Sequence, residues 1–376
     1  MIEAAQALER AERLMRAIIR LFRRRDRVLY REHYPGAEDE FPVSYLWSYS
    51  ALFSAVNALL KCHAGGSRRG SSWFPVFGNV LKGLACYRDA VREPAGYQDL
   101  PISQRVSDRY YDDNCWVAME DINGYENTRD PGLLANAEET YRFIASGWTD
   151  ELGGGIYWCE QKKATKNACS NAPAAVVALR LFRHCGNRRY MDDARRLYEW
   201  TRQALQDEDG LLFDHVGKDG TIDPTKYTYN AGAMISASCL FHECAGGREY
   251  LQEAERIAEA SLRHFGFQQA PGVVLLPSVN VWFNAVLVRG LMDLYAINGD
   301  PSWLDPLFAG ADHAWEKARD AQGLLNADWS GQETSRRKWL LEQASMVEIY
   351  ATEASYRELQ RHRGRGFRAR ISRDAG

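Results

Sequence analysis

The sequence has little net charge and no long apolar run. Its 376 residues carry a formal net charge of only -3, too small to favour nucleic acid or an anionic membrane as a partner. No stretch reaches the roughly 18 apolar residues of a membrane-spanning helix. The start, "MIEAAQALERAERLMRAIIRLFRRRDR", is typical of an amphipathic helix and not of a signal peptide. These absences predict a soluble, cytoplasmic protein with no membrane span, or a secreted one if a leader precedes these residues.

Several motifs that bind metals, nucleotides or disulfide partners are also missing. The eight cysteines include no CxxC pair and no zinc-ligand spacing, so we expect free, mostly buried thiols. The glycines at 153–155 belong to no GxGxxG or Walker motif, and "FHECA" lacks the second His of a zinc protease. The sequence therefore predicts no metal and no cofactor.

Helical periodicity dominates what is present. "SYLWSYSALFSAVNALLK" places apolar residues three and four positions apart, as on one face of a helix. Strand patterns are few, and the clearest is "GLLFDHVGKDGTID", which predicts a small hairpin. The chain is therefore expected to be all-α, with short hairpins in its loops.

One local design recurs along the chain. A polar turn with Gly or Pro precedes an apolar residue and then a helix rich in Ala, Glu and Arg, with Leu134, Met191, Leu251 and Leu304 at equivalent places. The period fits two helices and a connection, which predicts a solenoid or a closed ring of helix pairs. We expect one domain over residues 1–360. The basic segment 361–376 is expected to be a disordered, solvated tail, with RNA contact as the alternative.

Segments of another kind separate the repeated turns. "SDRYYDDNCW", "ELGGGIYWCEQ", "KNACSNAP", "TKYTYNAG" and "NADWSGQ" are rich in Gly, Asn, Asp, Tyr or Trp and occur about once per helix pair. If the helix pairs close into a ring, these loops gather at one mouth and the repeated turns at the other. Loops on a rigid scaffold commonly carry the functional site.

Two adjacent carboxylates, Asp112 and Asp113, stand among aromatic residues in "YYDDNCW". They could simply cap a helix, because Asp is preferred at helix N-termini. Alternatively, neighbouring helical residues can hold their carboxyl groups about 5 Å apart, as retaining glycosidases require. One carboxylate would then attack the anomeric carbon, and the other would protonate the leaving oxygen. Burial beside a like charge would separate their two pKa values.

Five motifs in order resemble glycoside hydrolase family 76, the α-1,6-mannanases and related proteins. They are "YYDDNCW", "GGGIYW" with "KNACSN", "YTYNAG", "NADWSG" and "LEQAS", spread over about residues 40–350. The resemblance implies an (α/α)6 barrel that hydrolyses α-mannosidic bonds with retention and without a metal. It implies Asp112 as nucleophile and Asp113 as acid/base, whereas the sequence alone does not separate their roles. Three positions depart from the family pattern: Val117, Ala231 and Asn284.

Further residues of these motifs are candidates for sugar binding. Trp158 could stack on a sugar ring, and Asn167 and Asn171 share a helix face from which amides could reach hydroxyls. Core filling is the alternative for the ring, and helix capping is the alternative for the amides. The complete set of predicted substrate-binding residues is Tyr111, Asn114, Trp116, Trp158, Asn167, Asn171, Tyr227, Tyr229, Asn230 and Trp329.

The expected function is hydrolysis of α-1,6-linked mannan or mannooligosaccharides. Helical toroids also carry sugar epimerases and lyases, which commonly use histidine, and His215 is the one histidine within or beside the aromatic loops. A glycan-binding or transglycosylating protein is the third alternative. The sequence leaves the oligomeric state and the endo or exo mode of action open. The arginine-rich, lysine-poor composition favours a bacterial source.

Overall fold

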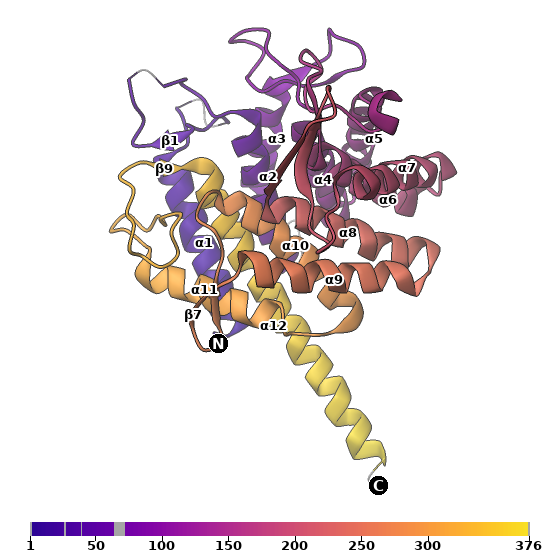
Figure 1. Cartoon of the computed structure of the whole chain (residues 1–376). Helices are drawn as coiled ribbons and strands as arrows, with labels where there is room; N and C mark the ends of the chain where they lie inside the picture. The colour runs from indigo at the N-terminus through magenta and orange to yellow at the C-terminus, as the bar shows by residue number, and fades with distance from the viewer. Residues whose placement is uncertain (1, 26–27, 39, 64–71, 375–376) are drawn as a thin grey trace.

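The structure, a computed structural model, describes residues 2–25, 28–38, 40–63 and 72–374, and beyond residue 363 only the course of the backbone. Alternate helices build a closed inner ring, in which each helix packs against the next and α12 returns to α2 (Figure 1). These are α2 (Leu46–Cys62), α4 (Tyr111–Thr128), α6 (Ala168–Cys185), α8 (Thr228–Ala245), α10 (Val281–Asn298) and α12 (Leu340–Asp374). The ring confirms the expected (α/α)6 barrel.

An outer layer of helices packs against this ring. It consists of α1 (Ala4–Leu21), α3 (Phe74–Leu84), α5 (Pro131–Ser146), α7 (Arg188–Leu205), α9 (Arg248–Phe265) and α11 (Leu304–Lys317). The inner helices are apolar on most sides, so α8 buries every residue from Thr228 to Phe241. The outer helices are amphipathic, as in α9, where only Ala254, Ile257, Ala258, Ala260 and Ser261 are buried.

The repeated polar turns connect inner helices to outer ones. After α6, Gly186 adopts a left-handed conformation (φ 68°), and the Asn187 side chain then accepts a hydrogen bond from the N–H of Arg189 at the start of α7. Gly299 (φ 73°) ends α10 in the same way. These turns all lie at the C-terminal ends of the inner helices, so the aromatic loops share the opposite mouth, as the sequence predicted.

Short strands lie in the loops of the aromatic mouth. β4 (Thr165–Asn167), β5 (Phe213–Gly217) and β6 (Ile222–Lys226) form one antiparallel sheet in that order, which confirms the predicted hairpin. β1 (His33–Tyr34) pairs with β9 (Lys338–Trp339), β2 (Arg88–Asp89) with β3 (Gly96–Tyr97), and β7 (Phe267–Ala270) with β8 (Val273–Leu275). Two 3-10 turns, η2 (Ala85–Tyr87) and η3 (Glu151–Gly153), complete the loops.

A layer of buried charge crosses the ring between its two mouths. Arg289 of α10 lies between Glu348 of α12 and Glu120 of α4, and its guanidinium also donates to Ser54 Oγ of α2 at 2.5 Å. Beyond this layer, toward the repeated turns, lies a polar cavity of about 280 Å³. Ser54, Arg289 and Glu348 are among the residues that line this cavity.

The segment after residue 360 differs from the sequence-based expectation. The structure continues α12 through Asp374, where the sequence predicted a disordered tail, and this helix projects from the barrel (Figure 1). The division of the chain at residue 360 stays a prediction. Among the described residues, no helix combines the length and the apolar composition needed to cross a bilayer.

Candidate active site

The start of α4 places the two carboxylates at the aromatic mouth. Tyr110 is extended (φ -100°, ψ 136°) and bridges to Cys159, while the Tyr111 N–H donates to the Trp158 carbonyl at 3.0 Å. The helix then begins, so Asp112 and Asp113 lie in its first turn. Its free N–H groups and dipole favour a negative charge at this end. The loop that carries Trp158 therefore fixes where the Asp pair points.

Asp112 has two hydrogen-bond donors on one oxygen and none on the other. Its Oδ2 accepts from the indole N–H of Trp158 at 3.0 Å and from the thiol of Cys169 at 3.4 Å. Its Oδ1 is buried, and no partner for it lies among the described residues. A buried acceptor without a partner costs about 1–3 kcal/mol, so such an atom requires an explanation.

The surroundings of the two carboxyl groups give them different pKa values. Burial raises the pKa of Asp112 to about 6, although the Trp158 and Cys169 hydrogen bonds oppose this rise. For Asp113, burial comes first and the charges of Asp112 and Asp99 add to it, so its pKa rises well above the usual range. The surroundings therefore favour the protonated form more strongly at Asp113 than at Asp112.

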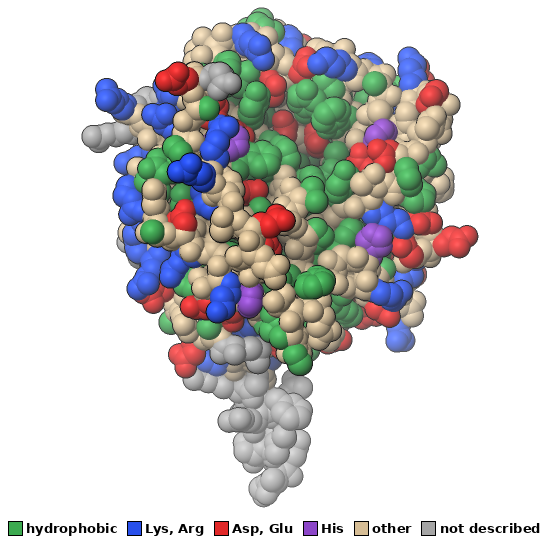
Figure 2. Space-filling view, turned by 60° about the vertical axis from the view of Figure 1, so that its left-hand side comes forward, with side chains coloured by type: hydrophobic (Ala, Val, Ile, Leu, Met, Phe, Trp, Pro, Cys, Tyr) green, Lys and Arg blue, Asp and Glu red, His purple; other side chains and the backbone are tan. Residues whose placement is uncertain are grey.

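Aromatic side chains line the mouth beside this pair. Trp158 is 40% exposed, and its ring centroid lies 4.8 Å from that of Tyr110. Opposite the start of α4, Tyr229 of α8 stacks on Phe283 of α10 at 4.0 Å, and Tyr227 packs against the same ring. The face turned forward in Figure 2 has a hollow in which hydrophobic and acidic side chains gather. Such surfaces suit sugar rings, which have apolar faces and hydroxyl edges.

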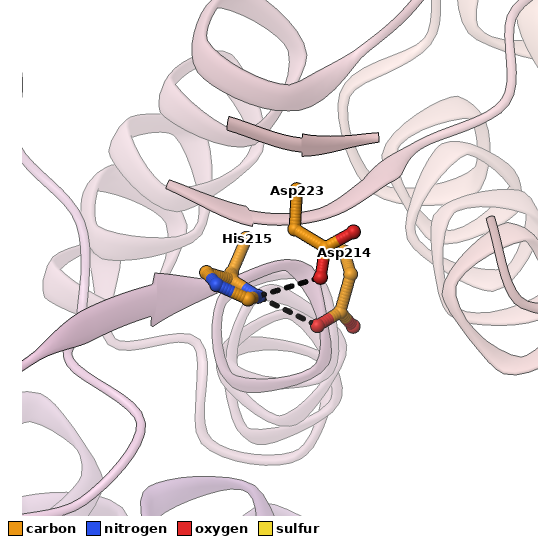
Figure 3. A group of neighbouring side chains, drawn as sticks. All are labelled: Asp214, His215 and Asp223. Carbon is orange, nitrogen blue, oxygen red and sulfur yellow. Dashed lines mark hydrogen bonds and ion pairs between the residues drawn. The ribbon is translucent and has the colours of Figure 1, made fainter. Parts of the chain in front are cut away.

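The β5–β6 hairpin adds a second group of ionisable side chains. His215 Nδ1 lies 2.8 Å from Asp214 Oδ2 and 4.0 Å from Asp223 Oδ2, as the dashed lines of Figure 3 mark. A bulge between Phe213 and His215 shifts the register of the hairpin. Within the described ranges, this is the one group whose ligand atoms lie close enough to hold a metal ion. His215 and Asp214 form a hydrogen bond with each other, and the absence of a metal stays a prediction.

Asp214 also connects this group to the Asp pair. The Asn167 amide lies 3.5 Å from Asp214 Oδ2, at the start of α6. The charge of Asp214 acts on Cys169 and Tyr229, which surround Asp112. Asn167 is thus one of the predicted residues that the structure brings to the mouth, together with Trp158, Tyr227 and Tyr229.

Other predicted binding residues are instead structural. Tyr111 is 2% exposed, and its ring stacks on Phe143 at 4.8 Å, away from the mouth. The Asn114 side chain exchanges two hydrogen bonds with the Tyr97 backbone, and Asn171 does the same with the backbone of Ile156. Both amides therefore fasten loops to inner helices, and substrate binding by these three residues stays a prediction.

Three further candidates lie below the surface. Trp116 meets Trp282 edge-on at 4.6 Å and is 3% exposed, and Trp329 is 2% exposed within the core. Asn230 is fully buried, and neither atom of its amide has a partner among the described residues. Burial places all three below the surface, and direct contact of any of them with a sugar stays a prediction.

The family departures are buried as well. Val117 is 0% exposed and Ala231 1%, both on inner helices. Asn284 accepts from Thr228 Oγ1 at 3.0 Å and donates to the Pro277 carbonyl at 2.9 Å. These positions therefore act on the mouth through packing and loop position.

Sequence reasoning missed Asp214, Cys169 and Phe283 as residues of the mouth. Asp214 was assigned only to a hairpin, and Cys169 was grouped with the buried thiols. Phe283 directly precedes Asn284, the one position of its segment that was singled out, and only the fold brings its ring to Tyr229. The one available signal was position: Asp214 and Phe283 both lie close to the point where a loop meets an inner helix.

A helical toroid whose mouth presents two adjacent carboxyls of unequal pKa among aromatic rings is the architecture of a glycoside hydrolase. The sequence profile described as "Glycosyl hydrolase family 76" matches residues 29–360. The chain belongs to this family, which confirms the resemblance stated from its motifs.

Solved structures of the family share the fold over nearly the whole chain. The family 76 mannosidase Bt3792 from Bacteroides thetaiotaomicron is 26% identical, with a TM-score of 0.87 over 95% of this chain and 100% of that one. An inactive variant of an α-1,6-mannanase from Salegentibacter sp. HEL1_6, in complex with α-1,6-mannotriose, is 24% identical with a TM-score of 0.77 over 93% and 99%.

Curated relatives match over a shorter part. The mannan endo-1,6-alpha-mannosidase DCW1 of Candida glabrata is 28% identical over 178 residues, which are 43% of this chain and 40% of that protein. The aligned part thus spans less than half the length of the curated relatives.

Proposed function

We propose that this chain hydrolyses α-1,6-mannosidic bonds in mannan or mannooligosaccharides, with retention of anomeric configuration. The observation that carries the proposal is the adjacent pair of carboxyls in the first turn of α4, where the pKa of Asp113 is raised further than that of Asp112. The names of relatives, a bacterial mannosidase and a fungal mannan endo-1,6-alpha-mannosidase, support mannan as the substrate. The bacterial relatives also support a bacterial source.

The first step would form a covalent ester. The Asp112 carboxylate attacks the anomeric carbon while the bond to the leaving O6 breaks, and Asp113 gives its proton to that oxygen. Asp112 then carries the mannosyl group. The position of Asp112 beside the half-exposed ring of Trp158 supports this role, because that ring lies at the open mouth.

The second step reverses the roles. Asp113, now ionised, takes a proton from water, the oxygen of the water attacks the anomeric carbon, and the ester bond to Asp112 breaks. Two opposite displacements restore the original anomer. If the hydroxyl of another sugar replaced water, the same intermediate would give transglycosylation, so transfer is a second outcome of the same site.

Digestion of linear α-1,6-mannan is the direct test of this activity. We expect new reducing ends and mannooligosaccharides, because cleavage of each bond frees one anomeric centre. Branched mannan and an added acceptor sugar serve as parallel substrates. Epimerisation of free sugar without chain cleavage would favour the epimerase alternative and contradict the proposal, whereas extension of the acceptor would indicate transfer.

Activity is expected to follow a bell-shaped dependence on pH. The rate should rise as pH passes about 6, because Asp112 must lose its proton to attack. It should fall again at higher pH, because Asp113 must keep its proton for the leaving oxygen, and its pKa is raised by burial and by Asp112. The apparent pKa values of the two limbs belong to the coupled pair and not to either residue alone. Values of kcat/KM from pH 4 to 9 measure both limbs, and a rate that stays flat below pH 6 would contradict the assignment.

A further inference from the structure

We propose that Cys169 is a positioning residue for the nucleophile: its thiol, supported by the Tyr229 hydroxyl, orients Asp112 and holds it in the ionised form. This inference rests on the proposed role of Asp112. The resemblance to the family does not supply it, since Cys169 falls on one of the two unspecified positions of the Lys-Asn-x-x-Ser-Asn stretch.

The geometry places the thiol on the nucleophile from a neighbouring helix. Cys169 is the second residue of α6, is 2% exposed, and has its Sγ 3.4 Å from Asp112 Oδ2. Trp158 donates to the same oxygen from the loop that precedes α6. Two donors on Oδ2 fix the rotation of the carboxylate and leave Oδ1 as the oxygen without a partner. Hydrogen bonds to a carboxylate favour its charged form.

The thiol keeps its proton and can therefore act as a donor. Burial, together with the charge of Asp112, raises the pKa of Cys169 well above the usual range. Burial likewise raises the pKa of Tyr229, whose hydroxyl contacts the same sulfur. The Cys169 S–H therefore donates to Asp112 Oδ2, and the Tyr229 hydroxyl is the group next to the sulfur that would support this donation.

Several other ionisable groups face this cluster and enter any pH profile. They come from the loop before α4, from α4 itself and from β5, and are Asp99, Asp113, Cys115 and Asp214. All of these are acids or thiols, and each one that is ionised disfavours a charge on Asp112. The donors on Oδ2 are therefore the groups that counteract this repulsion.

The test compares the pH dependence of kcat/KM in the wild type, Cys169→Ala and Cys169→Ser. In Cys169→Ala we expect the acid limb to move upward by about half to one pH unit, because one hydrogen bond to the charged form is lost. Serine restores a donor, so Cys169→Ser should move back toward the wild type. Cys239→Ala is the matched control: this thiol is also 2% exposed on an inner helix, but it lines the cavity of the opposite mouth.

A loss of rate in Cys169→Ala that is equal at every pH, with the acid limb unmoved, would overturn the proposal and indicate a packing role. Tyr229→Phe supplies a second test. If Tyr229 acts through the sulfur, its effect on the acid limb should disappear in a Cys169→Ala background. If Tyr229→Phe moved the acid limb equally far in that background, Tyr229 would not act through the sulfur, and this part of the proposal would be contradicted.

Infrared titration measures the ionisation of Asp112 without relying on activity. The signal of its carboxylate is the difference between each protein and its Asp112→Asn counterpart. The band of the ionised carboxylate should appear at higher pH in Cys169→Ala than in the wild type. Were the wild type inactive on mannan, the proposed function would fail while this titration still decided the role of Cys169. Identical titrations in both proteins would overturn that role.

Discussion

Asp112→Asn is expected to lower kcat on α-1,6-mannan by roughly 10⁴-fold or more, because the amide cannot form the glycosyl ester. Asp113→Asn should lower it by a similar factor on natural substrate, because the leaving oxygen of a sugar needs a proton. Initial rates from reducing ends measure both. Asp108→Asn is the matched control, since Asp108 precedes the pair in the same segment and forms an exposed ion pair with Lys162 at 2.7 Å.

The two variants should differ when the leaving group no longer needs an acid. With a dinitrophenyl mannobioside and added azide, Asp113→Asn should recover turnover and give the glycosyl azide of retained configuration. Asp112→Asn should form no product of retained configuration under these conditions, because it has no nucleophile. Full activity of either variant on mannan would refute the assignment of roles.

Folding of Asp112→Asn can be checked through its stability. A carboxyl whose pKa rises on folding stabilises the fold while it is protonated, and this contribution is lost as pH rises through the folded value. For Asp112, with a pKa raised from 3.8 to about 6, the loss amounts to roughly 3 kcal/mol. The Asn variant should therefore melt at a higher temperature than the wild type at pH 8, and the difference should shrink toward pH 4.

Arg289→Ala is expected to destabilise the fold by about 3–5 kcal/mol, since it leaves buried carboxylates without their counter-charge. Glu120 is 1% exposed and Glu348 5% exposed, and both contact this guanidinium. Burial by itself lowers the pKa of Arg289, but Glu348 and Glu120 outweigh it and raise that pKa above the ordinary value, so the side chain stays charged.

Denaturant unfolding followed by circular dichroism measures this loss. Arg263→Ala is the surface control, because its ion pair with Glu259 is exposed on both sides and should contribute less than about 1 kcal/mol. Replacing the whole group, with Arg289→Met, Glu120→Gln and Glu348→Gln together, should recover much of the stability. A loss in Arg289→Ala no larger than in Arg263→Ala would show that the charged layer does not hold the ring together.

The fold was predictable because its information is local. Each helix pair repeats the same turn, and the periodicity of "SYLWSYSALFSAVNALLK" is visible within one segment. The Asp pair was predictable for a similar reason, because two adjacent acids among aromatic residues are unusual and can be recognised within one short segment. Both features follow from short stretches that need no knowledge of distant contacts.

The orientation of single side chains could not be predicted in this way. Asp112 and Tyr111 are neighbours, but successive helical residues point about 100° apart, so one reaches the mouth and the other the core. Asn114 and Asn171 have amides that could bind sugar hydroxyls. Each amide instead forms hydrogen bonds with the backbone of a preceding loop, at Tyr97 and at Ile156, and the sequence does not show these contacts. The stacking of Tyr229 on Phe283 likewise depends on the closure of the ring.

The anomeric configuration of the first product, followed by proton NMR during the opening minutes of a digestion of linear α-1,6-mannan, decides between one displacement and two. Attack by Asp112 followed by water assisted by Asp113 predicts that the α-anomer appears first and mutarotates afterwards. Initial release of the β-anomer would mean that water attacks directly, and no ester on Asp112 could then be part of the reaction.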